Sequence, residues 1–293
     1  MSTEGAVKTY ASAEEESKAF IWKVYGYMSA GLLITGLVSL WLLSRPDIIL
    51  EHLYTITLRG GKLWWTPRPL LWVLSIGSLI FVWVVSARIS KMRAATVAIL
   101  LAIYSAVIGV IIAPTLFLYT KSSVASTFFI SAGMFASFSA FGYITKRDLS
   151  GIGSICMMAL WGIIIATVVN YFILHSTGMQ LVVAYIGVVI FAGLTAHDTQ
   201  KIKQLNVLGN AGTEEDTKEA LHGALHLYLD FINIFLFLLR ILGSRRNSPS
   251  RSIPERRVFC RTRRSLFRGP SRTIALSRRR SQSQEEPCTS RSG

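Results

Sequence analysis

Long uncharged apolar runs alternate with short polar stretches along most of the chain. Seven of these runs approach the roughly 20 residues that an α-helix needs to cross about 30 Å of hydrocarbon. The pattern therefore predicts an all-α integral membrane protein, built as a bundle of seven transmembrane helices. The predicted spans are 22–44, 69–88, 94–113, 124–144, 152–173, 180–197 and 221–241.

Local signals support individual spans. Pro69 suits a first helical turn, and Trp72 suits a membrane interface. The fourth span contains SAGMFASFSAFG, whose small residues let helices approach closely, so we expect it to lie inside the bundle. Spans five and six are joined only by the segment LHSTGM and are expected to be antiparallel neighbours.

The composition agrees with a membrane protein. The chain has 293 residues, of which 51% are hydrophobic and 16% are charged, whereas about 25% of residues are charged in soluble domains. Glutamates at 14–16 stand where a signal peptide has its basic region, and no small-residue cleavage site follows. We therefore expect the first span to remain in the mature protein.

Charge divides the chain into unequal parts. The net charge is +15, and residues 244–293 contribute most of it, with 14 Arg, no Lys and three Glu. The sequence predicts a cytoplasmic N-terminal segment (1–21), a seven-helix membrane domain (22–243) and a disordered Arg/Ser-rich tail (244–293). The tail either contacts phosphates of nucleic acid or anionic lipid, or has no evolved function. Arg without Lys, beside a body that uses both, favours the second interpretation, and we expect no nucleic-acid partner.

Cysteine usage adds no chemistry. Cys156 lies in an apolar run and is expected to be a small buried hydrophobe. Cys260 and Cys288 lie in the tail without metal-ligand spacing, so neither a disulfide framework nor a zinc site is indicated.

Basic loops predict the orientation. The loops after spans two, four and six carry ARISKMR, TKRD and QKIKQL, which places these loops and the N-terminus on the cytoplasmic side of the membrane. Two features disagree. Seven spans leave the basic tail outside, and the long loop after span one also carries basic residues: Arg45, Arg59, Lys62 and Arg68.

Asp230 is an acid within an apolar span, in the segment LHLYLDFINIFLFLLR. An ionised group at the centre of a bilayer costs at least roughly 2.5–3.5 kcal/mol, so intramembrane acids are functional candidates. The alternative is a permanently protonated Asp230 that makes a structural hydrogen bond between helices.

Asp198 ends span six, in the segment GLTAHDTQKIK. Consecutive spans can bring Asp198 and Asp230 together, and two close carboxylates do not easily both ionise. Such a pair can share a proton, or release it and bind calcium through hard oxygen ligands. Arg88, at the end of span two, is the candidate cation that would compete, with Lys91 and Arg93 as alternatives. The competing interpretation is an ordinary positive-inside loop.

Histidines accompany the acids. His222, His226 and Asp230 are spaced four apart on one helix face. His226 is a candidate for tuning the titration of Asp230, while a transition-metal site and a structural hydrogen bond are the alternatives. His197 is about 100° from Asp198 around the helix and is expected at the interface. No nucleophile has an evident base and no convincing zinc ligand set exists, so an intramembrane hydrolase is disfavoured and no enzyme is expected.

Four segments carry a family resemblance: KVYGYMSAGLLITG, GYITKRDLSGIGS, FAGLTAHDTQKIK and LYLDFINIFLFLLRILG. In their order, over residues 20 to 243, the chain resembles the transmembrane Bax inhibitor motif family, most closely its bacterial YccA- and YetJ-type members. The resemblance implies a multi-pass protein of the bacterial inner (plasma) membrane, built as a bundle with the last helix central. It also implies a pH-sensitive calcium leak gated by Asp198 and Asp230, with a gating arginine near Arg88.

The resemblance leaves a second function open. It also implies an interaction protein that regulates a membrane-bound ATP-dependent protease, or a stress or cell-death response, without conducting ions. Lipid, calcium and protons are the expected partners of the leak, and no cofactor other than calcium is expected. His197 replaces a common aromatic residue, and the tail has no family counterpart.

Overall fold

The structure is a computed structural model that describes residues 3–59, 62–205 and 212–246. Its helices are α1 (Thr3–Leu43), α2 (Pro46–Ile48), α3 (Pro69–Arg88), α4 (Ala94–Phe117), α5 (Lys121–Ile144), α6 (Ser150–Val169), α7 (Thr177–Leu205) and α8 (Glu214–Leu242). Short helical turns cover Ile49–Leu53, Ile89–Lys91 and Asn170–Leu174, and strands β1 (Tyr54–Arg59) and β2 (Lys62–Pro67) complete the described elements.

Among the described residues, seven helices are long and apolar enough to cross a membrane, which confirms the predicted all-α membrane bundle. The predicted third span stops at 113, whereas α4 continues through Pro114 to Phe117. Helix α1 runs without a break across the predicted boundary between 1–21 and 22–243. Only Ser244, Arg245 and Arg246 of the predicted tail belong to the described residues, and Cys260 and Cys288 lie outside them.

A β-hairpin occupies the loop after span one, which the sequence analysis treated only as a basic loop. Its antiparallel register runs from Tyr54 opposite Pro67 to Arg59 opposite Lys62. The sequence did contain a signal for this hairpin, because the segments YTITLR and KLWWTP carry β-branched and aromatic residues on either side of two glycines.

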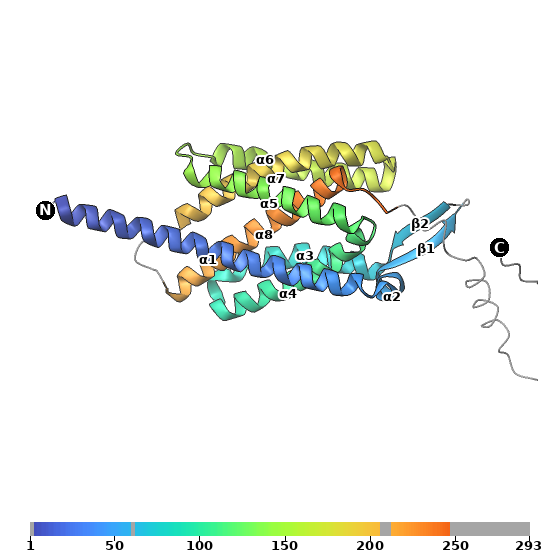
Figure 1. Ribbon diagram of the computed structural model, residues 1–293, viewed down its shortest axis with the longest axis horizontal. Helices are drawn as coiled ribbons and strands as arrows, with labels where there is room; N and C mark the ends of the chain where they lie inside the picture. Colours follow the sequence, from blue (N-terminus) through green and yellow to red (C-terminus); the bar gives the residue numbers. More distant parts are fainter. Residues whose placement is uncertain (1–2, 60–61, 206–211, 247–293) are drawn as a thin grey trace, which may run out of the picture. The chain divides into compact units, whose positions relative to one another are not determined.

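Helix α8 packs against α1, α4, α5 and α7, while α6 packs against α7 and α3 against α4 (Figure 1). The α6–α7 contact confirms that spans five and six are neighbours. That the last helix is central remains a prediction. Helix α5 is not enclosed as expected: its small residues Ser131, Ser139 and Gly142 are buried on one face, whereas Phe129 on another face is 73% exposed. One narrow face of small residues is enough for close helix approach.

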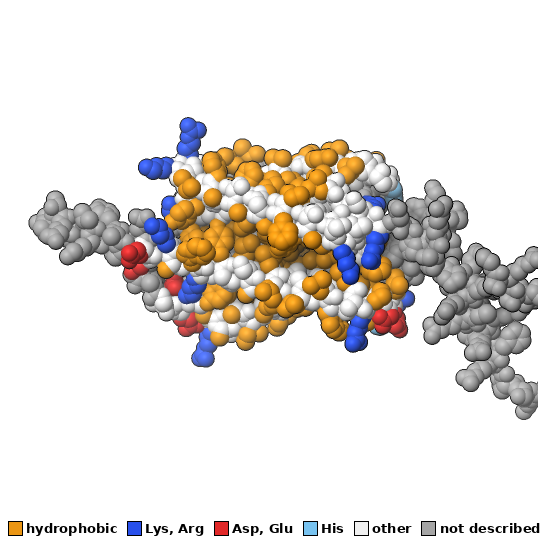
Figure 2. All heavy atoms as spheres, viewed as in Figure 1, with side chains coloured by type: hydrophobic (Ala, Val, Ile, Leu, Met, Phe, Trp, Pro, Cys, Tyr) orange, Lys and Arg blue, Asp and Glu red, His pale blue; other side chains and the backbone are white. Residues whose placement is uncertain are grey.

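The exterior is apolar around its middle. Figure 2 shows hydrophobic side chains across the body and the charged side chains gathered towards its two ends. Trp83, Leu79 and Val189 are among the exposed large residues. Water would not stabilise so large an apolar surface, whereas hydrocarbon does, so this surface is the lipid-facing side of the bundle.

Candidate ion site between α7 and α8

Close packing sets the register of α7 against α8. A Cβ added at Gly187 would meet the ring of Phe237, and one added at Gly223 would meet Ile202. In this antiparallel register Asp198 lies level with His226, and Asp230 lies about one helical turn further along α8. The two predicted acids therefore face the same interface.

Asp230 is buried, with 5% of its surface exposed. Its Oδ2 has no hydrogen-bond partner among the described residues. Asp198 is the charged group that acts on it electrostatically. A buried acceptor left without a partner costs about 1–3 kcal/mol, so this oxygen is suited to bind a proton or a cation.

Asp198 has two histidine neighbours. Its Oδ1 lies 2.9 Å from His197 Nδ1, and its Oδ2 lies 3.7 Å from His226 Nδ1. The expectation that His197 points away from Asp198 is therefore wrong, while its place at the membrane interface stays a prediction. The two Cα–Cβ bonds diverge around the helix, but rotation of the side chains brings the ring back to the carboxylate. The ring also lies beside Gly153 of α6, where a Cβ would collide with it.

His222 and His226 extend this cluster along α8. Their Nε2 atoms are 3.3 Å apart and their ring centroids 4.7 Å apart. One ring must donate and the other accept, so the two tautomers are linked. His222, His226 and Asp198 thus form one polar cluster between α7 and α8, about one helical turn from Asp230.

The histidines do not support the alternative transition-metal site. Within the described ranges, no group of three or more His, Cys, Asp or Glu side chains is arranged to hold a metal ion. His226 contacts Asp198 rather than Asp230. Cys156 is a half-buried free thiol beside Gly193 of α7, without a second thiol among the described residues.

The basic candidates lie apart from the acids. Arg88, Lys91 and Arg93 are all exposed. In the part of the chain that the structure describes, none of them forms an ion pair with Asp198 or Asp230. Helix α3 packs on α4 rather than on α7, although the turn Ile89–Lys91 does contact α8.

Sequence analysis missed a polar contact two residues before Asp230. Tyr228 is fully buried, and its hydroxyl lies 2.7 Å from Thr35 Oγ1 of α1. Thr35 Oγ1 in turn lies 2.8 Å from the carbonyl oxygen of Ser105 on α4. Polar residues inside three different predicted spans were the available signal, but the pairing depends on how the helices are rotated.

Comparison with known proteins identifies the family. A family model described as "Inhibitor of apoptosis-promoting Bax1" matches residues 17–247. The chain belongs to this Bax inhibitor family. The match confirms the resemblance carried by the four sequence segments.

Bacterial relatives of this Bax inhibitor family member align over nearly their whole length. The inner membrane protein YbhL of Escherichia coli (strain K12) is 43% identical over 230 residues, which cover 78% of this chain and 93% of YbhL. YrjE of Lactococcus lactis is 39% identical over 226 residues, covering 77% and 90%. A Borreliella burgdorferi protein is 38% identical over 228 residues, covering 78% and 93%. With its seven spans, the chain is a multi-pass protein of the bacterial inner membrane.

Proposed function

We propose that this protein is a pH-sensitive calcium leak, gated by Asp198 and Asp230 where α7 meets α8. The observation that carries the proposal is the buried Asp230 carboxylate. One of its oxygens has no hydrogen-bond partner among the described residues, and its charged neighbour is another acid. Two adjacent acids in a low-dielectric interior need a shared proton or a cation to be stable.

Protonation would control the gate. With a proton on the pair, the acids repel each other less and α7 packs tightly on α8, as in this structure. Loss of the proton leaves two carboxylates that repel each other and attract a hard cation such as calcium. Flux is therefore expected to rise as the pair ionises.

The basic residues at the end of α3 would compete with calcium. The turn Ile89–Lys91 contacts α8, so a movement of α3 relative to α8 would change the distance between this positive charge and the acids. Arg88 is our first candidate, with Lys91 and Arg93 as alternatives. Substituting the responsible residue by glutamine is expected to raise calcium flux at low pH.

The test is calcium flux into liposomes that contain the purified full-length protein, at pH 6 and pH 8. The wild type is expected to show pH-dependent flux, which Asp230→Asn removes because the amide cannot ionise. Glu51→Gln is the matched control, since Glu51 is an exposed acid outside the spans. If Asp230→Asn keeps the flux and pH profile of the wild type, the gating mechanism is wrong.

An interaction function is the second candidate. Helix α1 begins at Thr3, whereas the apolar run predicted as span one begins at 22, so the helix extends beyond the apolar segment. This extension is a candidate docking element for a membrane-bound ATP-dependent protease. Pull-downs from solubilised membranes, with full-length protein and with protein lacking residues 1–20, would test it. This hypothesis predicts that the protease is recovered only with the full-length chain, even where no calcium flux is measured.

A further inference from the structure

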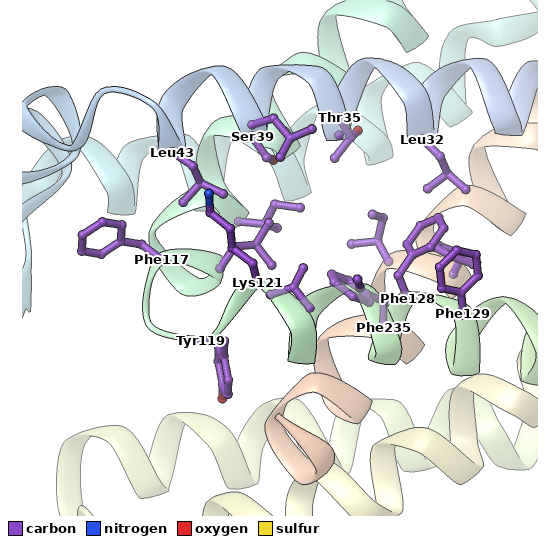
Figure 3. Close-up of a pocket in the computed structure, with 18 of the residues that line it drawn as sticks. Leu32, Thr35, Ser39, Leu43, Phe117, Tyr119, Lys121, Phe128, Phe129 and Phe235 are labelled. Atoms are coloured by element: carbon purple, nitrogen blue, oxygen red, sulfur yellow. The ribbon is translucent and has the colours of Figure 1, made fainter. Parts of the chain in front are cut away.

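A pocket of about 610 Å³ lies between α1 and α5 (Figure 3), and neither Asp198 nor Asp230 lines it. Helices α4 and α8 form its floor. Its walls are predominantly apolar and include Leu32, Leu40, Val124, Phe128, Ile232 and Phe235. This volume falls in the range of about 300–1,000 Å³ that is typical of ligand sites.

The pocket opens sideways towards the lipid. Helix α1 packs on α4 and α8, and α5 packs on α7 and α8, so the pocket lies where α1 and α5 diverge. Two residues at its edge, Leu40 of α1 and Phe129 of α5, are 65% and 73% exposed. A molecule can therefore enter from the hydrocarbon without crossing water, which favours an acyl chain as occupant.

Two cations line one end of this pocket. Figure 3 shows Lys121, the first residue of α5, reaching towards Leu43 and Ser39 of α1. Arg246 follows α8, and its guanidinium lies 5.8 Å from the ring centroid of Phe117. Neither cation has an ion-pair partner in the described part of the chain.

The backbone holds Arg246 at this place. Its N–H donates to the carbonyl oxygen of Leu118 at 2.9 Å, and the N–H of Thr120 donates to Ser244 at 3.1 Å. These bonds attach the segment after α8 to the connection between α4 and α5. Both cations are therefore positioned at the membrane end where a lipid headgroup would lie.

We propose that this pocket binds one acyl chain of an anionic phospholipid, whose phosphate contacts Lys121 and Arg246. Arginine binds phosphate oxygens bidentately and lysine acts as a point charge, so together they favour an anionic headgroup. This inference does not depend on calcium conduction, because neither Asp198 nor Asp230 lines the pocket.

Native mass spectrometry of the full-length protein in detergent tests this inference. Phosphatidylglycerol or phosphatidylcholine with identical acyl chains would be added at equal concentration. Two basic residues predict that phosphatidylglycerol binds tighter by roughly tenfold or more. The double substitution Lys121→Gln/Arg246→Gln is expected to abolish this preference. Lys146→Gln/Arg147→Gln, which removes two exposed cations that do not line the pocket, should preserve it.

A second pair of variants tests the cavity itself. Gly36 lines the pocket, and a Cβ added there meets no atom within 4 Å, so Gly36→Leu would fill the space without a backbone clash. It is expected to lower the binding of both lipids severalfold. Gly26→Leu is the control, because Gly26 lies on the same helix, has equally open space and does not line the pocket. Equal binding of the two lipids by the wild type would overturn the inference. So would a Gly36→Leu variant that loses calcium flux and keeps its lipid, because the cavity would then be an ion route.

Discussion

A carboxylate at the middle of a membrane helix is stable only when a proton, a cation or hydrogen-bond donors satisfy its oxygens. Asp230 has one oxygen without a partner among the described residues, and its charged neighbour is Asp198. This arrangement distinguishes it from Asp216, another buried acid of α8, whose carboxylate is paired with Lys23 at 2.9 Å. Burial alone therefore does not set Asp230 apart from Asp216; its unpartnered oxygen and its acidic neighbour do.

His226→Gln is expected to shift the pH dependence of calcium flux. His226 Nδ1 lies 3.7 Å from Asp198 Oδ2. An imidazole at this position can take up and release a proton, whereas a glutamine amide cannot. The measurement is liposome flux as a function of pH. His52→Gln is the control, since His52 is exposed outside the spans; a shift of the same size in both variants would contradict a local effect of His226.

At the scale of elements, glycines decide how closely the helices approach. A Cβ on Gly142 of α5 would overlap the backbone carbonyl of Ala196 on α7. Beside it, Ser139 Oγ lies 2.8 Å from Thr199 Oγ1 across the same interface. The backbone of α7 cannot move aside as a flexible side chain can. This contact therefore fixes the position of the part of α7 that carries Asp198.

Gly142→Ala is therefore expected to destabilise the protein by about 1–3 kcal/mol, as overpacking does. The measurement is thermal unfolding in detergent. Gly133→Ala, on the same helix, should leave the unfolding temperature nearly unchanged, because a Cβ there meets nothing within 4 Å. Equal stability of the two variants would show that α5 and α7 are not held by this close contact.

The pair Lys23–Asp216 joins α1 to α8. Lys23 Nζ lies 2.9 Å from Asp216 Oδ2 and 2.7 Å from Thr217 Oγ1. Lys23→Gln is expected to cost about 1–3 kcal/mol, because the buried Asp216 loses its cation. Lys218→Gln should cost at most about 0.5 kcal/mol, since Lys218 pairs at 3.7 Å with Glu214, whose side chain is 56% exposed. Chemical unfolding in detergent compares the two, and similar losses would contradict a special role for the α1–α8 pair.

At the scale of the whole molecule, seven spans place the two ends of the membrane domain on opposite sides. The basic loops predict a cytoplasmic N-terminus, so the segment after α8 should be outside. Alkaline phosphatase fused after Arg246 is therefore expected to be active, and a green fluorescent protein at the N-terminus should fluoresce. The opposite pattern of activities would reverse the orientation and place the Arg-rich tail in the cytoplasm.

The membrane class, the seven spans and the candidate acids follow from the sequence by itself. A span must be long and uncharged whatever surrounds it, so hydropathy alone predicts it, and an acid inside a span is visible for the same reason. The family was visible as well, because segments such as LYLDFINIFLFLLR keep their order along the chain. The hairpin was also within reach, through its strand residues around two glycines.

Only the tertiary structure decided which side chains meet. The contact of Asp198 with His197 and His226, the hydrogen bond between Tyr228 and Thr35, and the exposed position of Arg88 were not readable from spacing. The pocket between α1 and α5 was equally hidden. These features depend on the rotation and register of helices distant in sequence. Close packing at positions such as Gly142 and Gly187 sets both, and hydropathy along one helix carries no information about them.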